Sequence, residues 1–245
     1  NLDLEDLNRV TDHYGTVGGG YANKAGDAAG TTFDRPWATV GGGRFNNASG
    51  ARSTVGGGDS NGASGSVSTI GGGSSNSASG GLSTVVGGSH NTASGSSSTV
   101  GGGNANCAGG FVSWAAGTRA KVRPATDPGA GTCSGLTYPF GNGDQGTFIW
   151  ADSQAADFVS TGSDQFLVRA AGGMAINTND PAGADLRVNG DVRVETLRVD
   201  TLGTFSANSP TLCRNIGNQI ALCPPSSKRY KEAIADLPPS LGVVL

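Results

Sequence analysis

Three carboxylates in the second half of the chain are the local group whose residue type suits acid–base chemistry on a glycan. They are Asp144, Asp152 and Asp157. Glycoside hydrolysis commonly needs two carboxyl groups about 5–10 Å apart, one as acid and one as base or nucleophile. Their spacing is not diagnostic of that arrangement, so a glycan hydrolase remains one hypothesis among several.

The cysteines and histidines do not have the spacing of metal ligands. Cys107, Cys133, Cys213 and Cys223 form no Cys-x-x-Cys pair, and the two histidines lie far apart. We therefore predict no metal and no cofactor. The even cysteine count fits two disulfides, Cys107–Cys133 and Cys213–Cys223, in an oxidising compartment. Free buried thiols are the alternative.

The Gly-Gly-Gly runs are not phosphate loops, because they lack the Lys-Ser/Thr ending and the helix that follows it. They recur every fifteen residues, and other residue types keep the same step. The apolar, asparagine and alanine ranks are Val40, Val55, Ile70, Val85 and Val100; Asn46, Asn61, Asn76, Asn91 and Asn106; and Ala48, Ala63, Ala78, Ala93 and Ala108. The threonine and serine ranks are Thr39, Thr54, Thr69, Thr84 and Thr99; and Ser53, Ser68, Ser83, Ser98 and Ser113. A fixed short period indicates one unit stacked on itself.

Each repeat fits two short strands joined by glycine corners. Alternation along a strand predicts valine and alanine on one face, with threonine and serine on the other. The predicted inner residues are small, so one coil buries little. We therefore expect three parallel copies to pack valine and alanine along a common axis.

The composition also favours self-association. The chain of 245 residues has 43 glycines, 36% hydrophobic residues and 6% aromatic residues. So few large apolar side chains do not readily offset a chain entropy of about 1–2 kcal/mol per residue. A net charge of −3 and the strict Val/Ile register argue against disorder.

The same numbers exclude some partners. Nucleic-acid binding needs clustered Lys and Arg, which a net charge of −3 does not suggest. No apolar run approaches the roughly 20 residues of a membrane helix, so we predict no membrane insertion in this segment.

Two departures from the repeat are the expected ligand-contact regions. Val40 follows Val17 by twenty-three residues, so an insertion falls within residues 27–37. Repeat insertions lie on one face and often bind. The second departure is the long irregular segment 121–147. The candidate contact residues are Phe33, Arg35, Trp37, Tyr138 and Phe140.

The chain is predicted to be all-β throughout. Trp114 takes the threonine place of the next repeat and is expected to cap the last coil. Strands are expected near residues 148–150, 165–169 and 172–177, with a turn at Asn189-Gly190. The predicted sections are a lead-in (1–13), the repeats (14–117), a β-rich middle section with a long loop (118–180), an interleaved β stalk (181–225) and a terminal piece (226–245).

The repeat pattern Ser-x-Thr-Val-Gly-Gly-Gly-x-x-Asn-x-Ala-Ser-Gly resembles the head of trimeric autotransporter adhesins over residues 14–117. The resemblance implies a left-handed parallel β-roll in a homotrimer whose three chains share one core.

The run Ser226-Ser227-Lys228-Arg229-Tyr230-Lys231-Glu232 resembles the start of the intramolecular chaperone domain of endosialidases and phage tailspikes. In that family the domain drives trimerisation and then cuts itself off. The resemblance implies Ser226 as nucleophile, Lys231 as base and Pro225–Ser226 as the scissile bond, with a lysine pKa depressed by burial. Ser227 stands where the family has Asp, and the segment is far shorter than a whole chaperone domain.

The sequence thus predicts a homotrimeric extracellular fibre, a surface adhesin or tail-fibre-like protein on a cell or virion surface. It would bind a cell-surface glycan or protein, or another polymer, by multivalent contacts. The alternatives are a filament-forming subunit, a tailspike-type glycan hydrolase and an ice-binding solenoid that uses the threonine rank. Enzymatic activity is not expected apart from self-cleavage.

Overall fold

Every regular element in the described part of the chain is a β-strand. The computed structural model describes residues 7–29, 31–128, 131–136, 141–178, 186–188, 212–214 and 220–222. No helix occurs within these ranges, so the all-β prediction is confirmed for them. The chain divides into two units, Asn1–Gly190 and Asp191–Leu245, and the repeats lie in the first.

Most strands contain only two residues, because a corner follows each short extended segment. Those of the first sheet are β1 (Arg9–Val10), β3 (Lys24–Ala25), β5 (Asn47–Ala48), β7 (Gly62–Ala63), β9 (Ser77–Ala78), β11 (Thr92–Ala93), β13 (Cys107–Ala108), β15 (Ala120–Val122) and β17 (Phe158–Val159). Those of the second sheet are β2 (Thr16–Val17), β4 (Thr39–Val40), β6 (Thr54–Val55), β8 (Thr69–Ile70), β10 (Thr84–Val85), β12 (Thr99–Asn104), β14 (Trp114–Thr118), β16 (Phe148–Ala151) and β18 (Phe166–Arg169).

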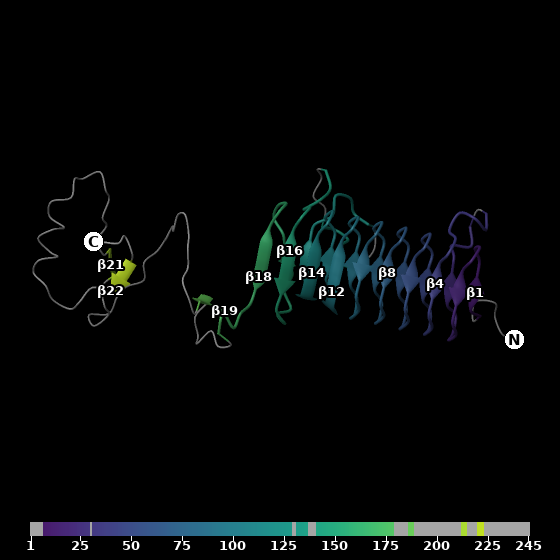
Figure 1. The fold of residues 1–245 in the computed structure, drawn as a ribbon, viewed down its shortest axis with the longest axis horizontal. Coiled ribbons are helices and arrows are strands. Elements are labelled where there is room, and N and C mark those ends of the chain that lie inside the picture. Colours follow the sequence, from purple (N-terminus) through teal and green to yellow (C-terminus); the bar gives the residue numbers. More distant parts are fainter. Residues whose placement is uncertain are drawn as a thin grey trace, which may run out of the picture. The chain divides into compact units, whose positions relative to one another are not determined.

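The chain alternates between these two nine-stranded sheets, so each turn adds one strand to both. All pairings within them are parallel and link successive turns: Thr39 pairs with Thr54, and Thr54 with Thr69. Figure 1 shows the turns stacked in a row. This arrangement is a parallel β-solenoid, and it is compatible with a β-roll.

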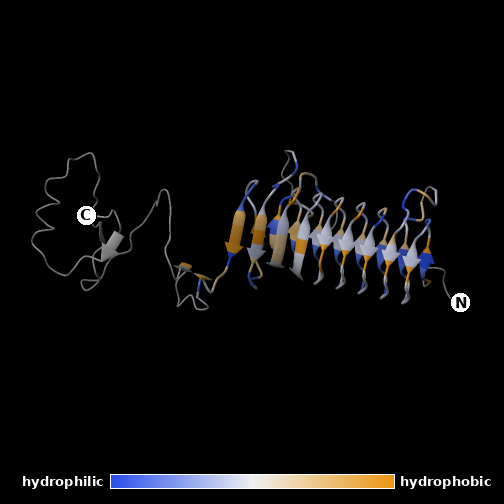
Figure 2. Cartoon of the chain, in the orientation of Figure 1, coloured by the Kyte–Doolittle hydropathy of each residue, from blue (hydrophilic) through white to orange (hydrophobic). Residues whose placement is uncertain are grey.

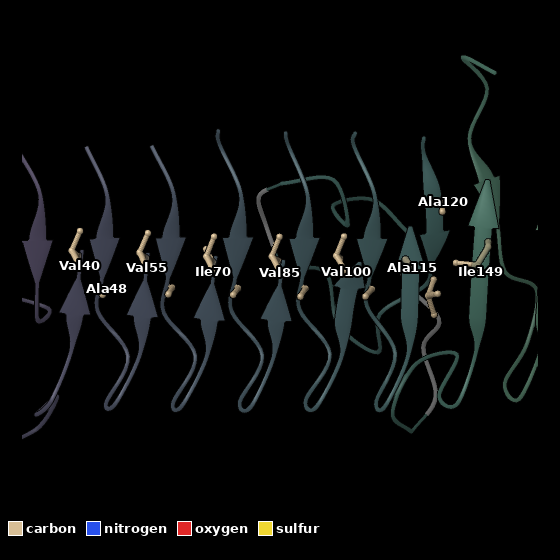
Figure 3. Close-up of a cluster of buried hydrophobic side chains, with 14 of the residues drawn as sticks. Val40, Ala48, Val55, Ile70, Val85, Val100, Ala115, Ala120 and Ile149 are labelled. Atoms are coloured by element: carbon tan, nitrogen blue, oxygen red, sulfur yellow. The ribbon is translucent and has the colours of Figure 1, made fainter. Parts of the chain in front are cut away.

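The interior is a double row of small apolar side chains. The apolar rank from Val40 to Val100 in one sheet and the alanine rank from Ala48 to Ala108 in the other are 0% exposed. Figure 3 shows Val40, Val55, Ile70, Val85 and Val100 at the same place in successive turns. The prediction that both ranks share one face is confirmed. The prediction that the serine rank faces outward is wrong. Ser53 lies two residues before Val55, so alternation brings its side chain to the buried face as well.

Because valine and alanine are fully buried within one chain, they cannot form an axis shared by three chains. The predicted packing of Val and Ala between copies is therefore wrong. Small side chains suffice because the two sheets of one coil lie close together and face each other. Any association between copies must use residues that the single chain leaves exposed.

A ladder of buried asparagines ties the turns together. In the central turn, the Asn76 amide Nδ2 donates to the Gly72 oxygen of its own turn at 3.0 Å and to the Gly88 oxygen of the next at 2.9 Å. It also donates to Asn61 Oδ1, which accepts the Asn76 backbone N–H at 3.0 Å. Asn76 Oδ1 in turn accepts the backbone N–H of Asn91. Equivalent contacts begin at Asn8 and end at Asn106, whose Oδ1 accepts the N–H of Ala120.

Glycine is required where the asparagine ladder meets the corner. Gly43 has a φ of 84°, in the left-handed region, and a Cβ there would collide with the Gly58 carbonyl oxygen. The space beside it belongs to the Asn46 amide, which reaches the same oxygen at 2.8 Å. The glycine run therefore serves close backbone approach rather than phosphate binding.

The solenoid does not stop at Trp114. Trp114 pairs with Phe148 of β16, which in turn pairs with Phe166 of β18. The predicted cap is therefore wrong, and the predicted boundary at residue 117 does not coincide with a break in the sheets. The fifteen-residue period does not predict this continuation, because the long 118–147 segment separates β14 from β16 in the sequence. At the other end, Arg9 pairs with Lys24, so the sheets begin within the predicted lead-in.

Beyond the solenoid, the strand predicted near residues 172–177 is observed as β19 (Met174–Ile176), which pairs in parallel with β20 (Leu186–Val188). In the second unit, β21 (Leu212–Arg214) pairs antiparallel with β22 (Ile220–Leu222). Most of the predicted stalk, including the turn at 189–190, and all of 226–245 lie outside the described residues.

We predict that Asn76→Ala lowers the free energy of unfolding by roughly 3 kcal/mol or more, because it leaves buried carbonyl and N–H groups unpaired. Urea unfolding followed by circular dichroism measures this loss. Ser77→Ala, at the next residue and on the outer face of β9, is the control and should change stability by no more than about 0.5 kcal/mol. Equal effects of the two substitutions would contradict a structural role for the ladder.

Candidate binding surface

The 27–37 insertion lies in the loop between β3 and β4, which extends beyond the neighbouring turns (Figure 1). Phe33 is 67% exposed and stacks on His13, with ring centroids 3.8 Å apart. Arg35 Nε lies 3.5 Å from Asp27 Oδ2. Trp37 is 49% exposed and stacks on Tyr14, with ring centroids 5.5 Å apart. The three predicted contact residues therefore belong to one exposed loop.

Trp37 also belongs to a stripe of corner residues that runs along one edge of the solenoid. Each precedes the strand of the second sheet by two residues and has a positive φ. This corner stripe consists of Tyr14, Trp37, Arg52, Val67, Leu82, Ser97 and Val112. Its five apolar or aromatic members are exposed, and Leu82 is 59% exposed. The guanidinium carbon of Arg52 lies 4.9 Å from the centroid of the Trp37 ring. Arg52 and Ser97 interrupt the apolar members, which still leave exposed apolar surface along this edge, and such surface is typical of an interaction site.

The second predicted contact region, residues 121–147, consists of the end of β15 and the loop 123–147 that leads to β16, and described residues of this loop are fastened to the outer face of the first sheet. Cys133 of the loop forms a disulfide with Cys107 of β13, which is one of the two pairings that the cysteine count suggested. Thr132 donates its N–H to Thr92 Oγ1 at 3.1 Å and its hydroxyl to the Asn106 oxygen at 2.7 Å. These contacts hold the loop against the turns that contain β11 and β13.

Lys121 adds a buried cation to the same attachment. Its Nζ donates to the Ala105 oxygen at 2.6 Å and to the Thr132 oxygen at 3.1 Å. Burial lowers the pKa of Lys121 from its ordinary value of 10.5. The side chain thus joins the solenoid to the loop through two carbonyl groups.

A groove of about 360 Å³ lies between this loop and the corners of the turns beside it. The solenoid wall includes three serines and an aromatic ring, and the loop wall includes a proline and an amide. These residues are Ser79, Ser94, Ser96, Phe111, Pro124 and Asn142. The volume falls within the usual range of small-ligand sites.

The three carboxylates proposed for glycan hydrolysis are each paired with an arginine. Asp144 is 0% exposed and accepts from Arg123 Nε at 2.7 Å and from another guanidinium nitrogen of Arg123 at 3.1 Å. Asp157 pairs with Arg119 at 2.7 Å, and Asp152 pairs with Arg169 at 2.8 Å.

The environment of Asp152 opposes a role as general acid. The Ala171 N–H contributes most to lowering the pKa of Asp152 to about 2, burial opposes it, and the Arg169 guanidinium lowers it further. A catalytic carboxylic acid needs a raised pKa instead. The local geometry therefore favours structural ion pairs over a hydrolytic centre.

Asp144 also joins segments distant in the sequence. Ser160, next to β17, donates its hydroxyl to the Asp144 carboxylate and accepts the Arg123 N–H at 3.1 Å. Arg123 and Asp144 lie near the two ends of the loop, so this contact closes its base. The sequence showed three separate residues of ordinary types, and no spacing indicated their contact.

One group of three carboxylates in the described part of the chain could share a cation. The carboxylate oxygens of Asp12, Asp27 and Asp34 lie within 4.8 Å of one another. Asp12 accepts the Asp27 N–H at 2.8 Å, and Arg35 pairs with Asp27. These contacts also account for the arrangement as a loop closure without an ion.

The outward threonine rank of the second sheet changes to aromatic residues in the last turns. Trp114, Phe148 and Phe166 follow one another, with successive ring centroids 4.3 Å and 4.9 Å apart. Figure 2 shows the corresponding change to hydrophobic colour at β16 and β18. These rings stack on each other, and Phe166 at the end of the ladder is 71% exposed.

The remaining predicted site residues cannot be placed. Tyr138, Phe140, Ser226, Lys231 and Cys223 lie outside the described residues. Cys213 falls in β21, but its side chain is not described.

The sequence matches no known protein-family model and no curated protein. Within the described ranges, no helix has the length and apolar character needed to span a bilayer.

We predict that Asp144→Asn lowers the free energy of unfolding by about 3–5 kcal/mol, because it replaces a fully buried carboxylate that accepts from Arg123 and Ser160 by a neutral amide. Urea unfolding of the whole chain measures the change. The matched control, Asp157→Asn, breaks a more exposed ion pair and should cost less than about 1 kcal/mol. Similar losses of stability in both variants would contradict the larger contribution that we assign to the buried Asp144 carboxylate.

We further predict an acid-dependent contribution from Asp152. Its folded pKa is depressed, so its stabilising effect is complete above its ordinary pKa of 3.8 and is lost as the pH falls through about 2. Wild type should therefore exceed Asp152→Asn in melting temperature at pH 5–7, and the gap should close near pH 2. A gap independent of pH between 2 and 6 would contradict this assignment.

Proposed function

We propose that this chain is the shaft and head of a homotrimeric extracellular fibre that adheres to a cell surface or another polymer. The observation that carries the proposal is the unbroken stack of paired turns, which repeats an outward threonine from Thr39 to Thr99. Repetition multiplies weak contacts into avidity without a deep pocket in any one copy.

The proposed trimer rests on the corner stripe rather than on the interior. Tyr14, Trp37, Val67, Leu82 and Val112 expose apolar surface along one edge, and association would remove that surface from water at about 25 cal/mol per Å². The resemblance of the repeats to trimeric autotransporter adhesin heads supports the same oligomer and a left-handed coil of fifteen residues.

The terminal resemblance supports the same assembly. A chaperone-type segment from Ser226 would drive trimerisation, with Ser226 and Lys231 performing the self-cleavage of that family. The Cys107–Cys133 disulfide fits an oxidising extracellular location.

The competing functions rest on weaker observations. A glycan hydrolase is disfavoured because each of its three candidate carboxylates has an arginine partner. An ice-binding face would use the outward rank from Thr39 to Thr99, which offers one threonine in each turn. A filament-forming subunit would polymerise end to end, so its assemblies would have no fixed mass, unlike a closed trimer.

We predict a native particle of about 73 kDa by light scattering, three times the 24.2 kDa of the chain. The double variant Val67→Glu/Leu82→Glu places charges on the corner stripe and should give monomers. Ser60→Glu, at the corner two residues before β7 of the first sheet and outside the corner stripe, should leave the trimer intact. A monomeric wild type would overturn the trimer, and a mass that grows with concentration would indicate the filament.

A further inference from the structure

The groove beside the 123–147 loop has the chemistry of a small polar ligand site. Ser79 and Ser94 occupy the same place in successive turns, so their hydroxyls repeat at about the 4.8 Å spacing of neighbouring strands. The Ser94 hydroxyl is buried and has no hydrogen-bond partner within the described structure. A buried hydroxyl without a partner costs free energy that a bound polar group can recover.

The apolar part of the groove complements these hydroxyls. Phe111 is 41% exposed, and Pro124 faces the groove from the loop wall. Apolar rings combined with a few fixed polar groups are typical of sites that bind and orient small molecules. Among the described residues that line the groove, none carries a charge.

A neutral saccharide has matching properties, since a sugar ring presents an apolar C–H face and a rim of hydroxyl groups that donate and accept hydrogen bonds. We propose that the groove binds a neutral saccharide segment. Phe111 and Pro124 contact the apolar face of the sugar, and Ser79, Ser94 and Asn142 bond to its hydroxyls. This inference rests on the proposed adhesive function, for which it names the ligand.

The disulfide makes this site conditional on oxidation. The loop wall is held by Cys107–Cys133, by the Thr132 contacts with Thr92 and Asn106, and at its base by the Arg123–Asp144 ion pair, so the disulfide is one of its attachments. The solenoid wall is held independently by strand pairing and the asparagine ladder. Reduction should therefore loosen one wall and weaken binding while the solenoid remains folded.

The test uses the full chain on an array of neutral, sialylated and sulfated oligosaccharides, followed by titration of the strongest ligand. We expect neutral oligosaccharides to bind, and Phe111→Ala and Ser94→Ala each to weaken binding at least tenfold. The matched controls are Phe45→Ala, an exposed aromatic at another corner, and Ser64→Ala, which stands two turns before Ser94 in the same place. Both should bind as wild type does. Circular dichroism confirms that all variants fold.

Separate outcomes distinguish this inference from the proposed function. Binding of only sialylated or sulfated glycans would overturn the neutral ligand, and unchanged affinity in both groove variants would overturn the site. If those variants still bind whole cells as wild type does, the adhesive function stands without the groove. If wild type binds neither glycans nor cells, both proposals fail. Loss of affinity under dithiothreitol, with an unchanged circular dichroism spectrum, would support the disulfide-held wall.

Discussion

The solenoid depends on the hydrogen bonds of one buried asparagine amide in each turn. This amide bonds to the preceding turn, to its own turn and to the following turn. Each asparagine of the ladder satisfies backbone groups at a glycine corner that strand pairing leaves open, such as the Gly72 carbonyl and the Asn91 N–H for Asn76. The corner must then approach its neighbour too closely for a side chain, which explains the glycine beside each asparagine. Because buried polar networks are costly unless complete, a turn that lost its asparagine would weaken the turns on both sides.

With the corners satisfied, the interior needs little apolar volume. One valine or isoleucine and one alanine fill the space between the two sheets in each repeated turn. A solenoid can therefore be built from glycine-rich sequence without large core residues. This is why the composition alone gave a misleading argument for a core shared between chains.

The outer positions do not pack in the interior, so their residue types differ from turn to turn. The corner stripe changes from tyrosine and tryptophan to valine and leucine, while the outward threonine rank ends in stacked aromatics. Two loops leave the coils without breaking the sheets, and the longer one is fastened by a disulfide, a buried lysine and a buried ion pair. The interior is thus nearly constant from turn to turn, whereas the edges differ.

The sequence by itself determined the stack of short strands and the inward valines and alanines, because a strict period leaves one repeating unit and alternation assigns its faces. It also showed the asparagine rank but not its role, since the partners are carbonyl groups of adjacent turns. Only the tertiary structure decided that β16 and β18 continue the same sheets, that Asp144 meets Arg123 and Ser160, and that the loop lies beside Ser79 and Ser94. These contacts join residues without a common period, so they follow from where the coils place the chain and not from its local pattern.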